Sequence, residues 1–370
     1  MKYFIIAGEA SGDLHAANLM KQLKKVDSEA SFMFFGGDLM QNEGGKMLVH
    51  YRDTAYMGVT EVLANWKKIK KNFEICYKNL LEYSPDAVVF VDYPGFNLKV
   101  AKFAKTHGFK TFYYISPKIW AWKKRRAYTI KKYIDKMFAI FPFEQDFYKQ
   151  FDYQVEYVGN PLVDAMKDYK LLDKEEFIKK YNLSSKPKIA FVPGSRKNEI
   201  QKLLPEMMKI IPAFNGEYEF LVCGAPGMDR SFYDRFLNEN VKIIFGDTYN
   251  VVKNSSAAVV TSGTATLETA FLGTPQVVVY KLNTVSYIAA ELLVKIKYFS
   301  LVNIISGREV VKELLQTKLS EDIKKEVLKI LGEKDYRDKM LEEYQKIKQI
   351  SGDGTASRKT AEIIYNEIKH

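Results

Sequence analysis

A short turn near the middle of the chain combines small residues with a fixed positive charge. The apolar segment Lys188–Val192 leads into Pro193-Gly194-Ser195-Arg196, and helical spacing begins directly afterwards. Backbone amides at a helix start attract anions, and an arginine guanidinium can form two parallel hydrogen bonds to phosphate oxygens. Gly194, Ser195 and Arg196 are therefore candidate phosphate ligands.

A second turn of this kind follows the apolar run Ala257–Val260, and helical spacing then resumes up to Gly273 and Pro275. The unpaired amides of a helix start there could bind a phosphate group, although the same residues could merely cap the helix. Glu268, one turn further on, could reach the sugar hydroxyls of a phosphate ligand. The candidate anion-binding residues are Ser262, Gly263, Thr264, Ala265 and Thr266.

One carboxylate is suited to acid–base chemistry. Asp92 follows the continuous apolar run Ala87–Val91, which is typical of a central parallel strand, and precedes Pro94-Gly95. Ligands of open α/β sheets bind outside the carboxyl ends of the strands. Asp92 could instead cap the following helix, which carries Leu98, Ala101 and Phe103, but its position favours a catalytic role. Asn97, in the same motif, is a candidate for the acceptor side of a cleft.

Two further strand ends carry polar turns. The first expected strand, residues 2–8, is followed by a turn that lacks the glycine spacing of a dinucleotide-binding or Walker A loop. The candidates in this turn for the acceptor side of a cleft are Gly8, Glu9, Ser11 and Asp13. Residues 110–115 end at Ser116, which is a further candidate for the acceptor side of a cleft, and aromatic residues and the basic run 123–132 follow. That run suits either nucleobases or a phosphorylated lipid at a membrane surface.

The elements that position these residues alternate between strands and helices. This order predicts an α/β protein with mostly parallel sheets. At 370 residues the chain favours two domains, and Gly159-Asn160-Pro161 marks the expected hinge. We place an N-terminal domain at residues 1–165 and a C-terminal domain at 166–349, with a last helix at 350–370.

The composition narrows the functional class. The formal charge of +11 is consistent with abundant surface lysine or with binding of nucleic acid, an anionic membrane or phosphorylated substrates. Two cysteines and four histidines form no recognisable metal motif. No apolar run is long enough to span a bilayer, and the N-terminus lacks the features of a signal peptide. We therefore expect a cytoplasmic protein.

Residues 56–71 have apolar side chains at helical spacing, followed by a cluster of lysines. A basic amphipathic segment with tryptophan at its boundary suits a membrane surface, although a core-facing helix with a solvated lysine end would show the same pattern. The candidate membrane contacts are Met57, Val59, Val62, Leu63, Trp66, Lys67 and Lys68.

Taken together in this order, the motifs resemble the lipid-A-disaccharide synthase family. The resemblance covers about residues 5–316 and includes two longer blocks, one from Phe141 to Asp164 and one from Ser300 to Glu309. The shorter motifs that carry it are Gly8–Asp13, Asp92–Asn97, Ser116–Trp122, Pro193–Arg196 and Ser262–Glu268.

The resemblance implies a GT-B fold, in which two Rossmann-like domains face each other across a cleft. It also implies transfer of 2,3-diacylglucosamine from its UDP conjugate to the 6-hydroxyl of 2,3-diacylglucosamine 1-phosphate, with inversion at the anomeric carbon. By analogy Asp92 is the general base and Arg196 the essential arginine at the phosphates. Asn303 and Glu309 lie in the family's late active-site block. Asn160 departs from the pattern, since many relatives have histidine there.

The same resemblance sets the expected partners. We expect no cofactor and no metal, because the chain contains no Asp-x-Asp sequence and Arg196 can supply the positive charge. Acylated substrates imply a peripheral position on the cytoplasmic face of the anionic inner membrane, and an oligomer is possible. The alternatives are another GT-B enzyme, such as a UDP-sugar epimerase or a peptidoglycan-precursor transferase, and a basic nucleic-acid-binding protein.

Overall fold

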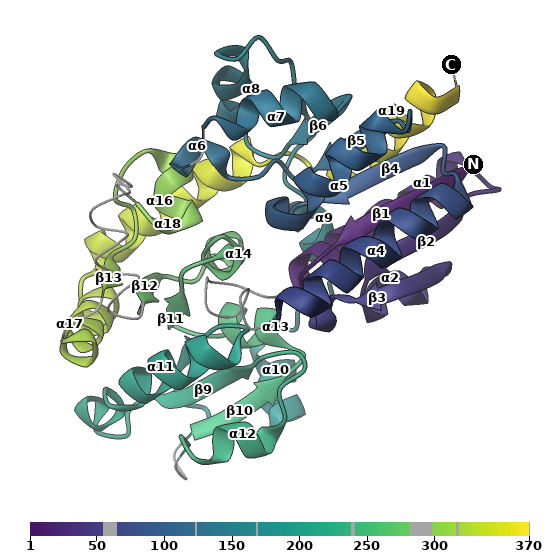
Figure 1. The fold of residues 1–370 in the computed structure, drawn as a ribbon. Coiled ribbons are helices and arrows are strands. Elements are labelled where there is room, and N and C mark those ends of the chain that lie inside the picture. Colours follow the sequence, from purple (N-terminus) through teal and green to yellow (C-terminus); the bar gives the residue numbers. More distant parts are fainter. Residues whose placement is uncertain are drawn as a thin grey trace. The chain divides into compact units, whose positions relative to one another are not determined.

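The computed structural model describes residues 1–54, 65–122, 124–167, 169–237, 241–281, 298–315 and 318–369. The chain forms two compact units (Figure 1). The first consists of Met1–Tyr169 together with Ile350–His370, and the second consists of Lys170–Gln349. Each unit is built on its own parallel sheet with helices on its faces.

The first unit contains a seven-stranded sheet in the order β3-β2-β1-β4-β5-β6-β7, in which every neighbouring pair is parallel. The strands are β1 (Lys2–Ala7), β2 (Ser31–Gly36), β3 (Lys46–His50), β4 (Ala87–Val91), β5 (Thr111–Tyr114), β6 (Lys136–Ala139) and β7 (Glu156–Tyr157). The central strands β1 and β4 are apolar and buried, as expected where helices cover both faces of a parallel sheet.

Helices connect these strands and cover the sheet. Their bounds are α1 (Ala10–Val26), α2 (Asp38–Asn42), α4 (Trp66–Tyr83), α5 (Pro94–Thr106), α6 (Ile119–Trp122), α7 (Arg126–Tyr133), α8 (Pro142–Lys149), α9 (Pro161–Lys167) and α19 (Ala356–Lys369), with a 3₁₀ turn at Tyr51–Asp53. Helix α19, at the end of the sequence, packs against α1 and lies among the elements of the first unit in Figure 1.

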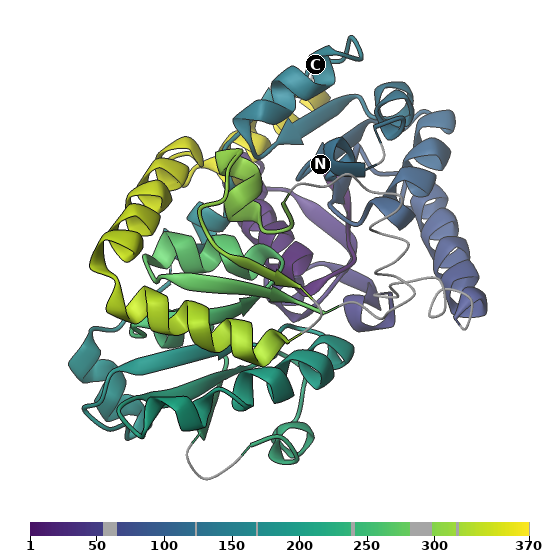
Figure 2. The ribbon, with the colours of Figure 1, turned by 90° about the vertical axis from the view of Figure 1, so that its left-hand side faces the viewer.

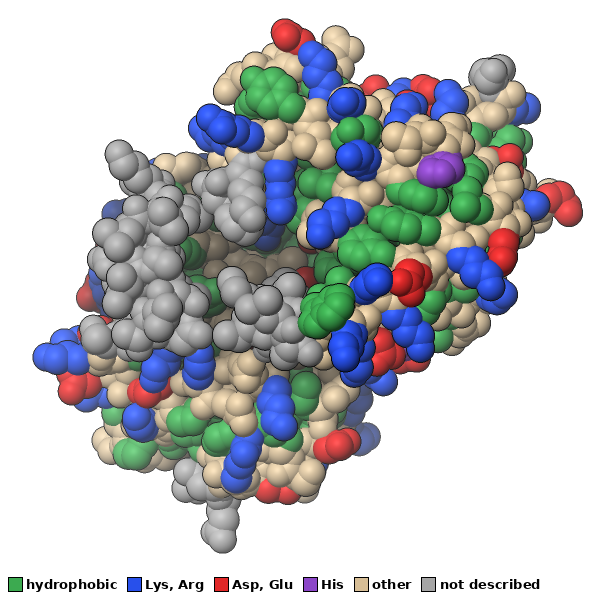
Figure 3. All heavy atoms as spheres, viewed as in Figure 1, with side chains coloured by type: hydrophobic (Ala, Val, Ile, Leu, Met, Phe, Trp, Pro, Cys, Tyr) green, Lys and Arg blue, Asp and Glu red, His purple; other side chains and the backbone are tan. Residues whose placement is uncertain are grey.

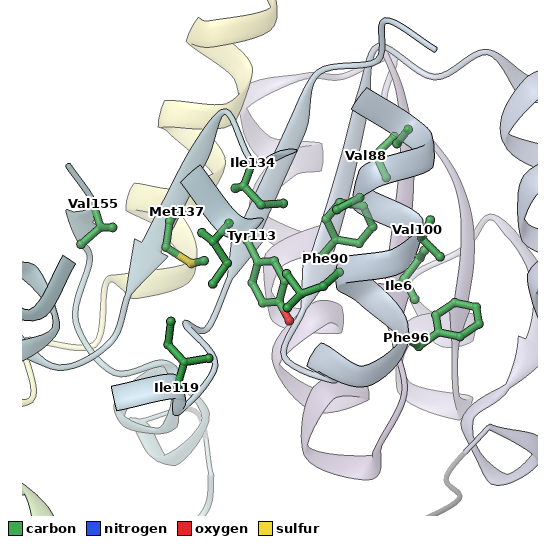
Figure 4. Close-up of a cluster of buried hydrophobic side chains, with 14 of the residues drawn as sticks. Ile6, Val88, Phe90, Phe96, Val100, Tyr113, Ile119, Ile134, Met137 and Val155 are labelled. Atoms are coloured by element: carbon green, nitrogen blue, oxygen red, sulfur yellow. The ribbon is translucent and has the colours of Figure 1, made fainter. Parts of the chain in front are cut away.

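The core of the first unit on the α5 side of the sheet is aromatic and aliphatic. Phe90 and Val100 lie between β4 and α5, and Tyr113 extends from β5 toward the same layer (Figure 4). All three side chains are fully buried. Burial of apolar surface of this kind is the main favourable contribution to folding, and it fixes the strand ends that carry the candidate residues.

The second unit contains a six-stranded parallel sheet in the order β10-β9-β8-β11-β12-β13. The strands are β8 (Lys188–Val192), β9 (Glu219–Gly224), β10 (Val241–Phe245), β11 (Ala257–Thr261), β12 (Gln276–Tyr280) and β13 (Glu313–Leu315). The described helices are α10 (Lys174–Tyr181), α11 (Lys197–Met208), α12 (Arg230–Asp234), α13 (Thr248–Lys253), α14 (Thr264–Leu272), α16 (Leu301–Ser306), α17 (Leu319–Gly332) and α18 (Lys334–Ile350), with a 3₁₀ turn at Ile211–Phe214. Helix α17 lies across one face of this sheet in Figure 2, where it contacts β11 and β12.

Candidate active site

The candidate residues of the first unit gather where its sheet changes direction. Strands β1 and β4 are neighbours in register, with Ala7 opposite Val91, and the chain leaves them toward opposite edges of the sheet. A crevice opens at such a switch point in open α/β sheets. The turns that begin at Gly8 and Asp92 therefore emerge side by side at the carboxyl ends of adjacent strands.

Asp92 is held in an unusual backbone conformation. Both Asp92 and Tyr93 have positive φ angles, 46° and 50°. A left-handed conformation is tolerated by aspartate but is uncommon for a bulky residue, and each such residue costs about 1–3 kcal/mol. Strain of this kind persists only where the surrounding contacts enforce it.

Three hydrogen bonds enforce the Asp92 turn. The Asp92 amide donates to the Tyr114 carbonyl oxygen at 3.1 Å. The Asp92 carbonyl oxygen accepts from the Tyr113 hydroxyl at 2.5 Å and from Asn97 Nδ2 at 2.7 Å. Asn97, a candidate cleft residue, is fully buried and acts on the backbone of Asp92.

The charge state of the Asp92 carboxyl reflects two opposing influences. Burial raises its pKa above the usual range, while the positive charge of Lys118 and a hydrogen bond from the Tyr93 amide oppose that rise. A carboxylate with a raised pKa is a stronger base than one in water. Lys118 belongs to the turn after β5, so a third strand end contributes to the surroundings of Asp92.

Gly8 allows the first turn to meet the second. A Cβ atom at Gly8 would lie 2.3 Å from Cδ1 of Tyr93, closer than any side chain tolerates. The Tyr93 ring therefore lies directly against the Gly8 backbone, and its hydroxyl donates to the Thr54 carbonyl oxygen at 2.7 Å. The contact between Gly8 and Tyr93 couples the β1 turn to the residue beside Asp92.

The other candidates of the first turn divide into two kinds. The Asp13 carboxylate is buried and accepts from the amides of Gly37, Leu39 and Met40 at 2.7–3.1 Å. It therefore stabilises the start of α2. Glu9 and Ser11 are half-buried at the start of α1.

The turn after β5 rests on a buried carboxyl group. The Ser116 hydroxyl lies 3.0 Å from the Tyr148 hydroxyl. Glu144 Oε1 accepts from Trp120 Nε1 at 3.3 Å, and Oε2 accepts from the Ile140 and Phe141 amides at 2.9 and 3.0 Å. Burial raises the pKa of Glu144 to about 7.

The second unit repeats the arrangement at its own switch point. Strands β8 and β11 are neighbours, with Val192 opposite Val260, and the chain leaves them in opposite directions. The turns Gly194–Arg196 and Ser262–Thr264 therefore emerge side by side at the carboxyl ends of adjacent strands, where α/β sheets bind phosphates.

The start of α14 is shaped by a glycine and two hydroxyl groups. Gly263 has φ 151°, a conformation that L side chains rarely adopt. The Thr266 hydroxyl donates to the Gly263 carbonyl oxygen at 2.8 Å, and the Ser262 hydroxyl donates to the Phe299 carbonyl oxygen at 3.1 Å. Both hydroxyls thus hold the turn itself. The amides of Thr264 and Ala265, in the first turn of α14, lack intrahelical acceptors by geometry.

Arg196 and Glu268 complete this group. Arg196 is the residue before α11, follows Gly194 with its φ of 120°, and pairs with Glu199 at 2.9 Å. Glu268 lies one turn inside α14, and burial raises its pKa to about 7. A guanidinium, helix-start amides and a half-buried carboxyl group suit a phosphorylated nucleoside.

The comparison with known proteins decides the family. Residues 3–367 match the family model described as lipid-A-disaccharide synthetase. The chain belongs to this family.

Curated relatives of the lipid-A-disaccharide synthase family match almost the whole chain. The protein named lipid-A-disaccharide synthase from Syntrophus aciditrophicus is 37% identical over 374 residues, which cover 99% of this chain and 97% of the relative. The protein of the same name from Myxococcus xanthus is 36% identical, and the alignment covers 98% of this chain and 96% of the relative. The one from Coxiella burnetii is 35% identical, and the alignment covers 98% of each chain.

Solved structures share the fold at low identity. UDP-GlcNAc 2-epimerase from Neisseria meningitidis, bound to UDP-GlcNAc, aligns with a TM-score of 0.67 and 14% identity, covering 99% of this chain and 100% of that one. The glycosyltransferase of kitacinnamycin aligns with a TM-score of 0.64 and 10% identity, covering 99% of both chains. The expected GT-B class, with two Rossmann-like units, is confirmed.

The two candidates from the late block, Asn303 and Glu309, differ in their surroundings. Asn303 is fully buried and uses both ends of its side chain: Oδ1 accepts from the Val310 and Val311 amides, and Nδ2 donates to Val311 and Glu313. It therefore holds the loop that carries Glu309. Glu309 is exposed and pairs with Lys312 at 3.2 Å.

The candidate membrane segment is described only in part. Met57, Val59, Val62 and Leu63 lie outside the described residues. Trp66, Lys67 and Lys68 form the first turn of α4 and are exposed, Trp66 by 55% of its surface. Within the described residues no helix is long and apolar enough to cross a membrane.

Two residues of the site were missed by the sequence analysis. Lys118 follows a proline in an aromatic stretch, and Glu144 resembles an ordinary first-turn helix acid. Burial distinguishes Glu144 from an ordinary acidic residue of a first helical turn. Lys118 differs from an ordinary surface lysine because its positive charge opposes the rise in the pKa of Asp92. In the described part of the chain, no group of three or more His, Cys, Asp or Glu residues is arranged to hold a metal ion.

Proposed function

We propose that this chain transfers 2,3-diacylglucosamine from its UDP conjugate to the 6-hydroxyl of 2,3-diacylglucosamine 1-phosphate. The products are the β-1,6-linked disaccharide 1-phosphate, a precursor of lipid A, and UDP. The observation that carries this proposal is the family match over residues 3–367, joined to candidate catalytic groups at both sheet switch points.

Asp92 is the proposed general base. Attack of the 6-hydroxyl on the anomeric carbon requires removal of the hydroxyl proton, and a positioned carboxylate can accept it. The raised pKa strengthens Asp92 as a base, while Lys118 and the Tyr93 amide favour the ionised form that must begin the reaction. The hydrogen-bonded turn fixes the backbone from which its side chain extends.

Arg196 and the start of α14 are the proposed ligands of the diphosphate. Negative charge develops on the departing UDP as the glycosidic bond breaks, so preorganised donors lower the barrier. The guanidinium of Arg196 and the amides of Thr264 and Ala265 are the proposed donors, with Gly194 and Ser195 in the same turn as Arg196. The Thr266 amide instead donates to the Gly263 carbonyl oxygen at 3.3 Å and so helps to form the turn. Glu268 is the proposed partner of the ribose hydroxyls. No metal or cofactor takes part in this proposal.

A membrane surface is the proposed place of reaction, because both substrates carry acyl chains. Hydrophobic and Lys or Arg side chains alternate on the face of the first unit over α4 and α5 (Figure 3). On that face the Lys99 ammonium lies 5.5 Å from the ring centroid of Phe73, and Tyr77 stacks on Phe103. With Trp66 and its neighbouring lysines, this face suits anionic headgroups on the cytoplasmic side of the inner membrane.

The deciding experiment supplies both substrates to the purified protein. UDP-diacylglucosamine and diacylglucosamine 1-phosphate should yield a disaccharide lipid and one UDP for each bond formed. UDP release without a disaccharide, or conversion of the UDP-sugar to its C2 epimer, would contradict the proposal. The second result would favour the epimerase activity named for several solved structures of this fold.

A further inference from the structure

The carboxylate of Glu199 is bound to the turn that carries the proposed phosphate ligands. Its Oε1 accepts from Arg196 NH1 at 2.9 Å, and its Oε2 accepts from the Ser195 amide at 3.3 Å. Glu199 lies in the first turn of α11, three residues after Arg196. One side chain therefore contacts both the guanidinium and the backbone beside it.

The turn is built to admit this carboxylate. A Cβ atom at Gly194 would lie 2.5 Å from Oε2 and 2.9 Å from Cβ of Glu199. Any residue other than glycine would therefore push Glu199 away, apart from its difficulty in adopting the φ of 120°. Gly194 thus serves the position of Glu199 as well as the turn.

A third residue borders the pair. Tyr280, the last residue of β12, has a pKa raised first by burial and then by the negative charge of Glu199, while the positive charge of Arg196 opposes the rise. Both members of the pair therefore act electrostatically on the Tyr280 hydroxyl.

We propose that Glu199 is a positioning residue that directs Arg196 toward the diphosphate of the sugar donor. This inference rests on the function proposed above. An arginine side chain loses much rotamer entropy when it is ordered, and its planar guanidinium presents five donors in a fixed geometry. The bond to Glu199 at NH1 restrains the guanidinium before the sugar donor binds, so less of this ordering remains for the substrate to impose.

The test compares two substitutions of Glu199 with a control on the same helix. Glu199→Asp shortens the side chain and Glu199→Gln removes its charge, so both should misplace Arg196 and lower kcat by about tenfold or more, equal to ~1.4 kcal/mol in the barrier. KM for the UDP-sugar should change less, because the charge on the leaving group is largest in the transition state. Glu206→Gln removes a carboxylate that pairs with Lys281 and Lys209, and should leave kcat unchanged.

The two substitutions separate positioning from a role in starting the helix. Aspartate is as favourable as glutamate near a helix N-terminus, so a Glu199→Asp variant with normal turnover would overturn the inference. Tighter UDP binding by Glu199→Gln would also overturn it, because the carboxylate would then be a competitor of the diphosphate. Thermal unfolding should be nearly unchanged in both variants, since a partly exposed ion pair stabilises a fold little.

Arg196→Ala separates this inference from the function on which it rests. If that variant loses turnover and Glu199→Gln adds no further loss to it, the two residues act together and the inference is supported. Additive losses would overturn the inference alone. Unchanged turnover and UDP affinity in Arg196→Ala would remove Arg196 from the diphosphate site, and the proposed function would then need another phosphate ligand.

Discussion

The side-chain amide of Asn97 donates to the carbonyl oxygen of Asp92 at 2.7 Å, across one turn at the start of α5. Asn97 was a candidate ligand in the sequence, yet it is fully buried beneath the proposed base. Together with the Tyr113 hydroxyl it holds a backbone conformation that few residues adopt. The orientation of the proposed base thus depends on a residue that need not touch substrate.

Asn97→Ala should therefore lower both stability and turnover. The variant loses one of the two donors to the Asp92 carbonyl oxygen, and a single hydrogen bond of this kind contributes about 0.5–1.5 kcal/mol to stability. Its loss also allows the Asp92 turn to relax. Thermal unfolding and kcat measure the two effects. Asn79→Ala is a matched control, because its Nδ2 donates to Ile75 within α4 at 2.8 Å. Equal turnover in the two variants would contradict a positioning role for Asn97.

Asp92→Asn should retain UDP binding while kcat falls by ~10²–10⁴-fold, the range expected for loss of a general base. The nucleotide should still bind because its proposed ligands belong to the second unit. Calorimetry with UDP and a disaccharide-forming assay measure these quantities separately. Weak UDP binding, or nearly normal turnover, would count against the assignment.

The affinity for UDP-sugar should rise with pH through a window near 7 that is set by Glu268. Burial raises the pKa of this carboxyl group to about 7, so it is largely protonated below that pH. Only the ionised form accepts hydrogen bonds from both ribose hydroxyls, and so binding should release a proton and strengthen as pH increases. The Glu268→Gln variant should bind the UDP-sugar more weakly than the wild type at pH 8, and its affinity should no longer depend on pH. A wild-type affinity that is constant from pH 6 to 8 would contradict the proposed role of Glu268 at the ribose.

Trp66→Ser combined with Lys67→Ser and Lys68→Ser should weaken binding to anionic vesicles. Each lysine near an anionic surface contributes about 1 kcal/mol, so the loss should exceed tenfold at low salt and shrink at high salt. Vesicle co-sedimentation measures it. A charge-matched control replaces the exposed Lys325 and Lys339 of the second unit. Equal losses in both variants would show that only net charge matters.

Part of this architecture could be predicted from the sequence. Continuous apolar runs such as Ala87–Val91 and Ala257–Val260 identify buried parallel strands, and the polar turns that follow them must lie at one edge of each sheet. The edge strands β3 and β13 were missed because they are short and only half-buried, so they lack such a run.

The roles of individual polar residues were harder to predict, because their partners are distant in sequence or depend on burial. Asp13 binds amides more than 20 residues away, and Asn303 closes a loop through four hydrogen bonds. Nothing in their sequence neighbourhoods separates such residues from ligands of a substrate. Glu144 likewise becomes unusual only when the fold removes it from water.

The first unit is assembled from two stretches of chain that the whole second unit separates. Residues 170–349 are continuous, so the ribosome completes them before α19 is made. Helix α19 then docks on α1 and on α9, where the Asp164 carboxylate of α9 accepts from the Ala356 and Ser357 amides at 3.1 and 2.7 Å. During translation the unit that carries Asp92 is therefore begun before the second unit and completed after it, and the α1 surface that α19 contacts stays uncovered until residues 356–369 emerge.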